Sequence, residues 1–285
     1  MKGIIREKKF RDFLKQEEKS EATICKYLRD VRVYGEWIES EKIEGAFSSE
    51  KAAKKVALRY KEYLTDSDLK TCSINTKLAS INSYMACIGY SVRLKYIKVQ
   101  KQHFYSKDKE LTGVEYRKLV MKAYEMGNER LALIIETLAS TGLRISELEY
   151  VTVEGLKARK VQVFLKGKSR VVYLPMKLCV KLHEYVLDHE IEEGPIFRTS
   201  HKTPVSRKQI WREMKGAAEA AEIEYTKVFP HNMRHVFAKT YYRQFRDIST
   251  LANILGHSSL ETTRIYIASS RENAEKQIDS LAMLR

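Results

Sequence analysis

Residues 161–173, VQVFLKGKSRVVY, contain the strongest strand signal of the chain. Apolar residues alternate at Val161, Val163 and Leu165, and a second apolar run begins at Val171. The segment between the two runs, KGKSR, is rich in lysine and arginine. This pattern predicts an antiparallel hairpin with a cationic turn, inside a β region that spans residues 153–174.

Helical periodicity dominates on the N-terminal side of this region. Apolar residues recur at helical spacing there, and all four prolines of the chain lie after residue 174. The sequence therefore predicts a small helical bundle over residues 1–95, with helices at 20–39, 50–64 and 73–88. The polar and basic residues 96–110 are expected to link this bundle to a second domain.

The second domain is predicted over residues 111–285 and begins with the capping-box pattern Thr112-x-x-Glu115. Gly256 is expected to end one helix, the next helix carries Tyr266, and a final helix spans residues 270–285. Other helices are expected at 112–151, 176–189, 206–223, 231–245 and 247–255. The predicted fold class is mainly α with a small antiparallel β-sheet in the C-terminal domain, that is, α+β.

The charge balance favours a polyanionic partner. The chain has 52 Lys and Arg against 37 Asp and Glu, a net charge of +15. Residues 1–105 contribute +8 (22 basic, 14 acidic) and the remainder +7 (30 and 23), so both domains are basic. Nucleic acid is the first candidate partner, while an anionic membrane surface and a basic protein with no nucleic-acid role stay open.

The sequence gives no sign of export, membrane insertion or metal binding. No run of about 18 apolar residues occurs, and the charged start MKGIIREKKF lacks the apolar core of a secretion signal. The four cysteines have no zinc-like spacing and are expected to be reduced core residues, at positions Cys25, Cys72, Cys87 and Cys179. We therefore expect a cytoplasmic protein without a metal ion or cofactor.

Several residues of the C-terminal part suit metal-free cleavage of a phosphodiester. That reaction needs a nucleophile, positive charge for the phosphorane oxygens and an acid for the leaving oxygen. The chain offers these residue types in separate short segments: Arg144 in TGLRISEL, Lys166 and Lys168 in LKGKSR, His231 and Arg234 in PHNMRH, His257 in LGHSS and Tyr266 in TTRIYIA.

Each of these residues also has an ordinary structural explanation. Arg144 and Glu147 could form a simple i,i+3 helix ion pair, and the lysines could decorate a solvated hairpin tip. Histidines often begin or end helices, and Tyr266 is one of 17 tyrosines. Only the combination of residue types in this order carries weight.

Taken together, these segments resemble the tyrosine recombinase (phage integrase) family, and most of all its compact Xer-like members. The resemblance is strong over residues 111–268, through LRISEL, H-x-x-R, LGH and the T-x-x-Y of residues 263–266. It is weaker in the N-terminal helices, which are similar to the core-binding domain of the family. The implied architecture is a two-domain clamp on DNA.

The resemblance implies a role for each matching residue at the scissile phosphate. Tyr266 would attack the phosphate and form a 3′-phosphotyrosine, freeing a 5′ hydroxyl. Arg144 and Arg234 would hold the non-bridging oxygens, with Glu147 as a supporting residue near Arg144.

The remaining matches imply proton transfer and hydrogen bonding. Lys166 would protonate the leaving 5′ oxygen, but Lys168 could do so instead, because the turn is a residue shorter than the common family form. His231 would assist proton transfer at the tyrosine, and His257 would hydrogen-bond the phosphate. The resemblance implies no metal, cofactor or ATP.

The implied partner is double-stranded DNA with inverted-repeat core sites. The chain would be a monomer or weak oligomer when free and a homotetramer on two DNA sites, with the final helix docked on a neighbouring protomer or on its own domain. The length leaves no room for an extra arm-binding domain, which favours simple core sites. Integration and excision of a mobile element, or resolution of replicon dimers, are both compatible. The alternatives are a type IB topoisomerase or telomere resolvase, and a non-catalytic DNA-binding protein of the same fold.

Overall fold

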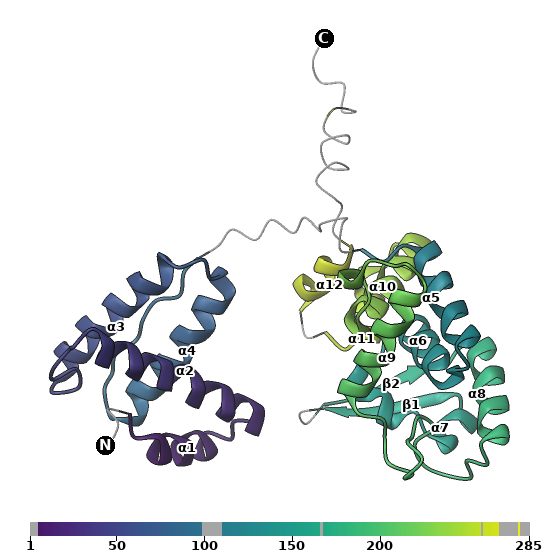
Figure 1. Ribbon diagram of the computed structural model, residues 1–285, viewed down its shortest axis with the longest axis horizontal. Coiled ribbons are helices and arrows are strands. Elements are labelled where there is room, and N and C mark those ends of the chain that lie inside the picture. Colours follow the sequence, from purple (N-terminus) through teal and green to yellow (C-terminus); the bar gives the residue numbers. More distant parts are fainter. Residues whose placement is uncertain (1–4, 99–109, 166–167, 258, 268–278, 280–285) are drawn as a thin grey trace. The chain divides into compact units, whose positions relative to one another are not determined.

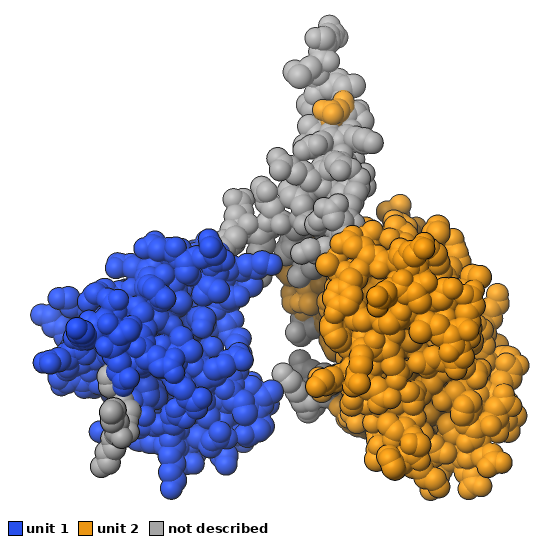
Figure 2. All heavy atoms as spheres, in the orientation of Figure 1, with its two compact units in different colours: residues 1–101 blue, residues 102–285 orange. Residues whose placement is uncertain are grey.

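The computed structural model describes residues 5–98, 110–165, 168–257, 259–267 and 279. The chain divides into two compact units, which we call unit 1 (residues 1–101) and unit 2 (residues 102–285) (Figure 2). Each unit is described by itself below. No helix of the described ranges is long and apolar enough to cross a membrane.

Unit 1 is built from four helices in its described part (Figure 1). The helices are α1 (Glu7–Gln16), α2 (Glu21–Ser40), α3 (Glu50–Thr65) and α4 (Thr71–Cys87). Serine hydroxyls fix two of the helix starts, because Ser20 accepts from the backbone of Thr23 and Ser49 from that of Ala52. Helix α1 was not predicted, since it buries only Phe10 and Leu14 and so shows a weak apolar pattern.

The core of unit 1 is rich in aromatic rings. Tyr34 and Trp37 of α2 pack against Tyr60 of α3, with ring centroids 4.8 Å (Tyr34–Tyr60) and 5.0 Å (Trp37–Tyr60) apart. These large, rigid side chains bury much apolar surface for few residues, which stabilises a small bundle.

An extended strap, residues 91–98, follows α4 and is held on that helix by two asparagines. Asn82 accepts from the backbone N–H of Leu94 at 2.8 Å and donates to its carbonyl at 3.1 Å. Asn75 pairs in the same way with Ile97, at 2.8 and 3.0 Å. Asn75 and Asn82 are seven residues apart on the helix, and Leu94 and Ile97 are three apart on the extended strap. Both separations span about 10 Å, so the two asparagines can bind the strap at the same time.

Unit 2 contains further helices, two short 3₁₀ turns and the hairpin. Its elements are α5 (Gly113–Glu125), α6 (Glu129–Thr141), η2 (Ile145–Tyr150), α7 (Val153–Lys157), β1 (Lys160–Leu165), β2 (Lys168–Tyr173), α8 (Met176–Asp188), α9 (Arg207–Ala220), η3 (Tyr225–Lys227), α10 (Pro230–Phe245), α11 (Ile248–Leu255) and α12 (Leu260–Ile267). The prediction of a mainly helical fold with a small antiparallel sheet is confirmed.

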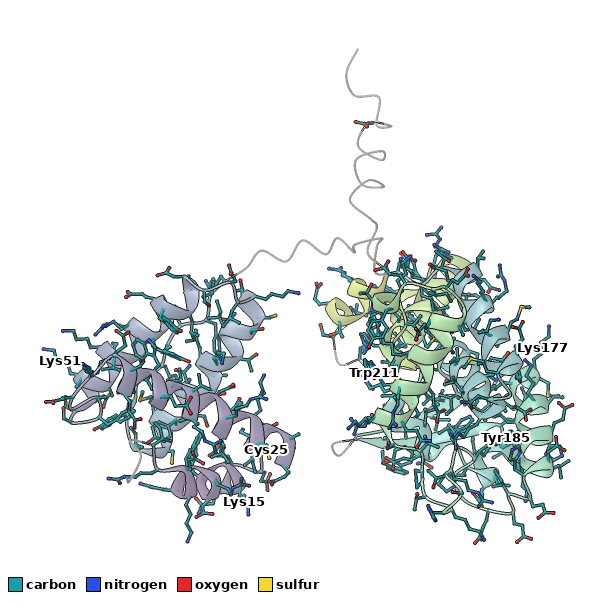
Figure 3. The ribbon with its side chains drawn as sticks, viewed as in Figure 1. Lys15, Cys25, Lys51, Lys177, Tyr185 and Trp211 are labelled. Carbon is teal, nitrogen blue, oxygen red and sulfur yellow. The ribbon has the colours of Figure 1, made fainter. Side chains whose placement is uncertain are left out.

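Helix α6 is the centre of unit 2. Residues 131–135 are all buried, together with Leu138, so this helix is covered on every side. Helices α5 and α10 pack against it. Side chains crowd around this centre, while Trp211 on α9 stays partly exposed (Figure 3).

The β region is shorter than the sequence predicted. Strands β1 and β2 pair antiparallel from Lys160–Tyr173 to Leu165–Lys168. The predicted β region began at residue 153, which was wrong, because residues 153–157 form helix α7. The Thr152 hydroxyl caps this helix by accepting from the backbone of Gly155, and Thr152 is a favourable helix-start residue that the apolar pattern hid.

Two predicted helix signals at the ends of unit 2 are confirmed. Thr112 and Glu115 form a capping box at the start of α5, and Gly256 ends α11 in the left-handed conformation. The predicted linker lies mostly outside the described residues, and the predicted final helix at 270–285 does so except for Asp279.

Candidate active site

Four segments of unit 2 meet around the buried guanidinium of Arg234. It donates to the carbonyl of Gly142 at the end of α6, to the carbonyl of Leu255 at the end of α11, and to the ring of His257. The hydroxyl of Tyr266, on α12, lies 3.4 Å from Nε2 of His231 on α10. The structure therefore brings the predicted residues of all these segments together within one chain.

Gly142 allows this close approach of helices. Its φ of +67° is left-handed, and an added Cβ would lie 2.6 Å from Phe237 and 2.8 Å from Leu255. With no side chain at this position, the carbonyl of Gly142 can reach Arg234, and the chain turns sharply into Leu143 and Arg144.

Glu147 holds Arg144 at the start of the 3₁₀ turn η2. One carboxylate oxygen, Oε2, accepts from the backbone N–H of Arg144 at 2.7 Å, and Oε1 accepts from its Nη1 at 2.9 Å. The Arg144 side chain is 33% exposed, whereas that of Glu147 is fully buried. The i,i+3 ion pair is thus present, and it orients a half-exposed guanidinium.

Glu147 stays ionised despite its burial. Burial would raise its pKa, but hydrogen bonds from Arg170 and from the backbone and side chain of Arg144 outweigh burial and lower the pKa to about 2. Arg170, from β2, makes a bidentate pair with this carboxylate, at 2.8 Å for each bond.

Burial disfavours the charge of Arg234 without removing it. Burial and the neighbouring Arg144 lower its pKa to about 10, while the nearby Tyr266 hydroxyl favours the charged form. Because this value is still well above neutrality, Arg234 is a cation in the interior. An anion entering the site would therefore gain from a charge that is already desolvated.

His257 is neutral, and its partners define its tautomer. Arg234 can only donate, so Nε2 of His257 accepts from it at 2.9 Å. Nδ1 then carries the proton and donates to the hydroxyl of Thr263 at 2.8 Å. Burial, together with Arg234, Arg144 and Arg170, lowers the pKa of His257 to about 4.

Three histidine rings surround the Tyr266 ring, which is only 5% exposed. The centroid distances to Tyr266 are 4.3 Å for His235 and 5.4 Å for both His231 and His257. Burial and nearby cations lower the pKa of His231, and they lower that of His235 to about 3. At neutral pH the tyrosine therefore has a neutral imidazole nitrogen beside its hydroxyl.

The net charge of the site is positive, as an anion-binding pocket requires. Three arginines and one ionised carboxylate give 3 − 1 = +2, since the histidines are neutral: Arg144, Arg170, Arg234 and Glu147. A phosphodiester carries one negative charge and oxygens that match guanidinium geometry. The arrangement suits nucleophilic attack by a tyrosine on a bound phosphate.

Comparison with known proteins identifies the family. The profile of the phage integrase family matches residues 109–273. The chain belongs to the phage integrase family. It is 28% identical over 285 residues to the tyrosine recombinase XerA of Pyrococcus furiosus, covering 96% of this chain and 93% of that protein. It is 26% identical over 275 residues to the TnP I resolvase of Bacillus thuringiensis, with coverage of 91% and 93%.

A solved structure supports the same fold for this phage integrase family member. The XerH site-specific recombinase bound to a palindromic difH substrate, in a post-cleavage complex, superposes with a TM-score of 0.74 at 19% identity. The match covers 90% of this chain and 79% of that one.

The lysines are the part of the predicted site that the structure leaves open. Lys166 lies outside the described residues, and only the backbone of Lys168 is described. The pairing of Leu165 with Lys168 leaves two residues between the strands. The choice between the two lysines therefore stays a prediction.

Three side chains of this family member's site escaped the sequence reasoning. Arg170 counted only as one cation of the segment KGKSR, and no role in the site was predicted for His235. Thr263 was noted only as part of a motif. A polar or charged residue on an otherwise apolar face was the available signal for His235 and Arg170, but their partners lie far away in sequence.

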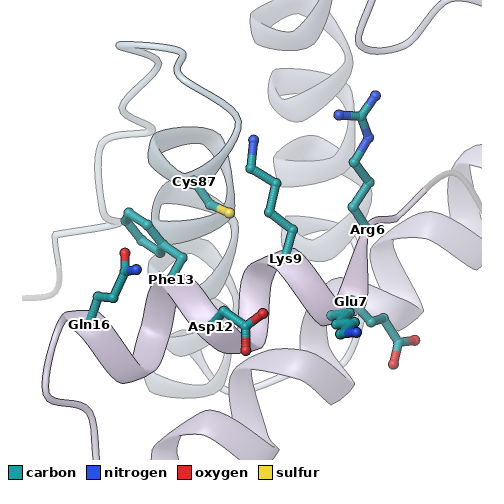
Figure 4. A pocket seen from close by; sticks show the side chains of 8 residues that line it. Arg6, Glu7, Lys9, Asp12, Phe13, Gln16 and Cys87 are labelled. Carbon is teal, nitrogen blue, oxygen red and sulfur yellow. The ribbon is translucent and has the colours of Figure 1, made fainter.

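Unit 1 has a separate hollow of about 650 Å³ along α1 (Figure 4). Charged side chains of both signs line it, with the thiol of Cys87 at its base. Burial raises the pKa of that thiol, so Cys87 is less reactive than a free cysteine.

Proposed function

We propose that this member of the phage integrase family is a site-specific DNA recombinase that cuts and rejoins strands through a phosphotyrosine bond to Tyr266. The observation that carries the proposal is the position of the Tyr266 hydroxyl. It lies beside His231 and next to the buried Arg234 of the same chain. The side chains that we propose as nucleophile, base and anion pocket thus all belong to one protomer.

The first chemical step transfers the scissile phosphoryl group from the 5′ oxygen of DNA to the tyrosine oxygen. The Tyr266 oxygen attacks the scissile phosphorus, the bond from phosphorus to the 5′ oxygen breaks, and a 3′-phosphotyrosine forms. The lowered pKa of His231 keeps its ring neutral at neutral pH, and the tautomer with an unprotonated Nε2 takes the phenol proton. Lys166, or Lys168 in its place, gives a proton to the leaving 5′ oxygen.

The arginines stabilise the charge that develops on the phosphorane. Arg144 presents the part of its guanidinium that Glu147 does not hold, and Arg234 adds a desolvated positive charge. In the DNA-free arrangement His257 orients Arg234, because Nε2 accepts from that arginine. A direct hydrogen bond from His257 to phosphate would need a change of tautomer or partner.

Strand exchange between two duplexes needs two DNA sites and four protomers. Each protomer supplies one tyrosine, and exchange between two duplexes requires cleavage of four strands. We therefore propose a homotetramer on two sites, each with inverted core repeats, formed from a monomer or weak oligomer. The XerH relative is bound to a palindromic substrate, which fits such a site.

The domain roles extend the same proposal. We propose residues 1–95 as a core-binding domain, 96–110 as a basic linker and 111–285 as the catalytic domain, and we retain the expectation of a C-terminal helix at 270–285. Both parts of the chain are basic, so they would close on the duplex mainly through phosphate contacts. The enzyme would work in the cytoplasm, associated with the nucleoid.

The family relatives narrow the class of reaction without choosing its biological use. Their names, tyrosine recombinase and resolvase, favour recombination over a topoisomerase, a telomere resolvase or a non-catalytic protein. Resolution of replicon dimers and integration or excision of an element both remain within the proposal.

A suicide substrate tests the proposal. Double-stranded DNA from the regions flanking the gene, nicked near candidate sites so that the cleaved fragment diffuses away, should accumulate a covalent adduct with the wild-type chain. Tyr266→Phe should form none, while Tyr185→Phe, on α8 and outside the site, should react like wild type. An adduct that survives Tyr266→Phe would contradict the assignment, and mapping the adduct gives the DNA site.

A further inference from the structure

We infer that Arg170 is a positioning residue, which fixes the hairpin that carries the candidate general acid relative to Arg144. The inference rests on the proposed function and adds a residue to its machinery. Among the described residues, the guanidinium of Arg170 bonds to Glu147 and Ile254 and not to the Tyr266 hydroxyl. It acts through the groups that it holds.

Three nitrogens of the Arg170 guanidinium are bound to other elements. Nη1 and Nη2 donate to the two oxygens of Glu147 at 2.8 Å each, and Nε donates to the carbonyl of Ile254 at 3.2 Å. Strand β2 is thereby tied to the turn η2 and to the end of α11. The guanidinium is planar and rigid, so these three bonds fix both distance and orientation.

Glu147 is the shared partner of both arginines. Its Oε1 accepts from Arg144 Nη1 and Arg170 Nη1, and its Oε2 accepts from the Arg144 backbone and Arg170 Nη2. Four donors fill the acceptor sites of one carboxylate. The position of Arg144 and the position of β2 therefore both depend on one carboxylate.

The space for Arg170 is built into the end of α11. A Cβ added to Gly256 would lie 2.7 Å from Cδ of Arg170 and 3.1 Å from its Nε. Gly256 has a left-handed φ of +65°, and it directly precedes His257. The same glycine thus ends the helix, admits the arginine and leads to the histidine that binds Arg234.

Arg170 lies near the end of the hairpin. It pairs with Val163, and only the pairs Phe164–Ser169 and Leu165–Lys168 separate it from the turn. The bonds to Glu147 tie β2 to the Arg144 turn, together with a bond from the Tyr150 hydroxyl of η2 to the carbonyl of Phe164 on β1, so loss of Arg170 would loosen the hairpin against that turn. A misplacement of about 1 Å far from the chemistry can slow a reaction by about 100-fold.

A buried ion pair is a poor device for stability alone. Apolar side chains of similar volume often stabilise a fold as well or better, because they avoid the desolvation of two charges. The bidentate geometry, with a third bond to Ile254, instead suits a role in which orientation matters.

The test compares Arg170→Gln with a matched control, Arg130→Gln. Arg130 also pairs with one glutamate (Glu213, 2.9 Å) and one backbone carbonyl (Arg198, 3.2 Å) of unit 2. Single-turnover cleavage is measured at saturating DNA on two suicide substrates. One is ordinary DNA, and the other has sulfur in place of the 5′ bridging oxygen, which leaves as a thiolate and needs no acid.

We expect Arg170→Gln to cleave ordinary DNA about 10- to 100-fold more slowly than wild type. On the sulfur substrate, the deficit of this variant relative to wild type should be smaller by at least tenfold. Arg130→Gln should match wild type on both. Wild-type speed of Arg170→Gln on ordinary DNA, or an equal loss on both substrates, would overturn the inference.

Two further measurements keep the test decisive. Arg170→Lys retains the charge but not the bidentate geometry, so it should be slowed less than Arg170→Gln, and it replaces that variant if Arg170→Gln fails to fold. A wild-type chain that forms no adduct would overturn the proposed function and this inference together. An active wild type with an equally active Arg170→Lys and Arg170→Gln overturns only the inference.

Discussion

Unit 1 buries phenol hydroxyls and the carboxylate of Asp30, whereas unit 2 buries a guanidinium and a carboxylate at its candidate site. Burial raises the pKa of Tyr34, raises that of Tyr60 to about 12, and so keeps both rings neutral. In unit 2, Arg234 and Glu147 keep their charges in the interior. Neutral groups are the less costly choice for a core, so the cluster of buried and partly buried charges around Glu147 and Arg234 points to a role beyond stability.

The difference also concerns how the buried groups are satisfied. The Tyr34 hydroxyl has no hydrogen-bond partner among the residues that the structure describes. Glu147 has four donors, and Arg234 binds two carbonyls and a histidine. Unit 1 leaves a weakly polar hydroxyl unpaired, whereas the buried ions of unit 2 have several partners each, although Nε of Arg234 has none among the described residues.

The largest effect is expected at Arg234. Arg234→Met removes a preorganised charge from the phosphate pocket, so single-turnover cleavage should slow by about 10³-fold. The rate of covalent adduct formation on a suicide substrate measures this. Tyr34→Phe in unit 1 is the control and should cleave at the wild-type rate, while an Arg234→Met variant within tenfold of wild type would break the comparison.

Removal of the buried carboxylate should cost stability. Glu147→Gln leaves Arg144 and Arg170 without their anion, and we expect the free energy of unfolding of unit 2 to fall by about 3 kcal/mol. Urea unfolding followed by Trp211 fluorescence, in a Trp37→Phe background, reports unit 2 alone, since the chain has two tryptophans. No loss of stability would show that the attraction in the ion pairs only offsets the desolvation of their charges.

The acid response of Glu147 follows from its low pKa. Its folded pKa is about 2, against an ordinary value of 4.5. The carboxylate therefore contributes its full stability above about pH 4.5, and that contribution is lost as the pH falls towards 2.

Mild acid should lower the stability of unit 2 more than that of unit 1. His235 and His257 have folded pKa values of about 3 and 4, so between pH 6.5 and these values only the unfolded chain takes up their protons. Stability of unit 2 should fall as pH decreases, by about 2 kcal/mol per histidine at pH 5. Residues 1–101 contain no histidine, so unit 1 should change little over the same range.

The matched variant for this pH effect is His235→Phe. In urea titrations at pH 7 and pH 5, the free energy of unfolding of this variant should fall less than that of wild type, by the contribution of one histidine. An identical pH dependence in wild type and variant would mean that His235 takes up its proton in the folded state.

The smallest effect concerns the unpaired phenol of unit 1. Tyr34→Phe removes a buried hydroxyl that makes no hydrogen bond within the described residues, so unit 1 should be unchanged or more stable by up to about 1 kcal/mol. Urea unfolding of wild type and variant, followed by circular dichroism, checks this. A clear loss of stability would reveal a partner for the hydroxyl.

Local signals explain what the sequence could predict. The Thr112–Glu115 capping box, the left-handed Gly256 and the alternation around residues 161–173 each act within a few residues. The segments that carry Arg144, Arg234, His257 and Tyr266 were recognised as motifs, and the structure places these side chains around one pocket. Their catalytic roles stay predictions.

The missed features depend on contacts over long distances in sequence. Arg170 and Glu147 are 23 residues apart, and no spacing rule relates a strand residue to a 3₁₀ turn. Helix α7 was hidden because Val151 and Val153 alternate as in a strand, although Val153 and Leu156 have the i,i+3 spacing of a helical turn. The contact of His235 with Tyr266 also arises only when α10 and α12 meet.

The asparagine clasps on α4 have a practical consequence for dissecting the protein. The amides of Leu94 and Ile97 are bonded to side chains and not to a helix or sheet, so they should exchange slowly with deuterated solvent. Slow exchange there would mean that the rigid body of unit 1 continues ten residues beyond Cys87, the last residue of α4. An isolated N-terminal fragment should therefore extend to at least Lys98, because a cut at the helix end would strip two amide–carbonyl clasps from its surface.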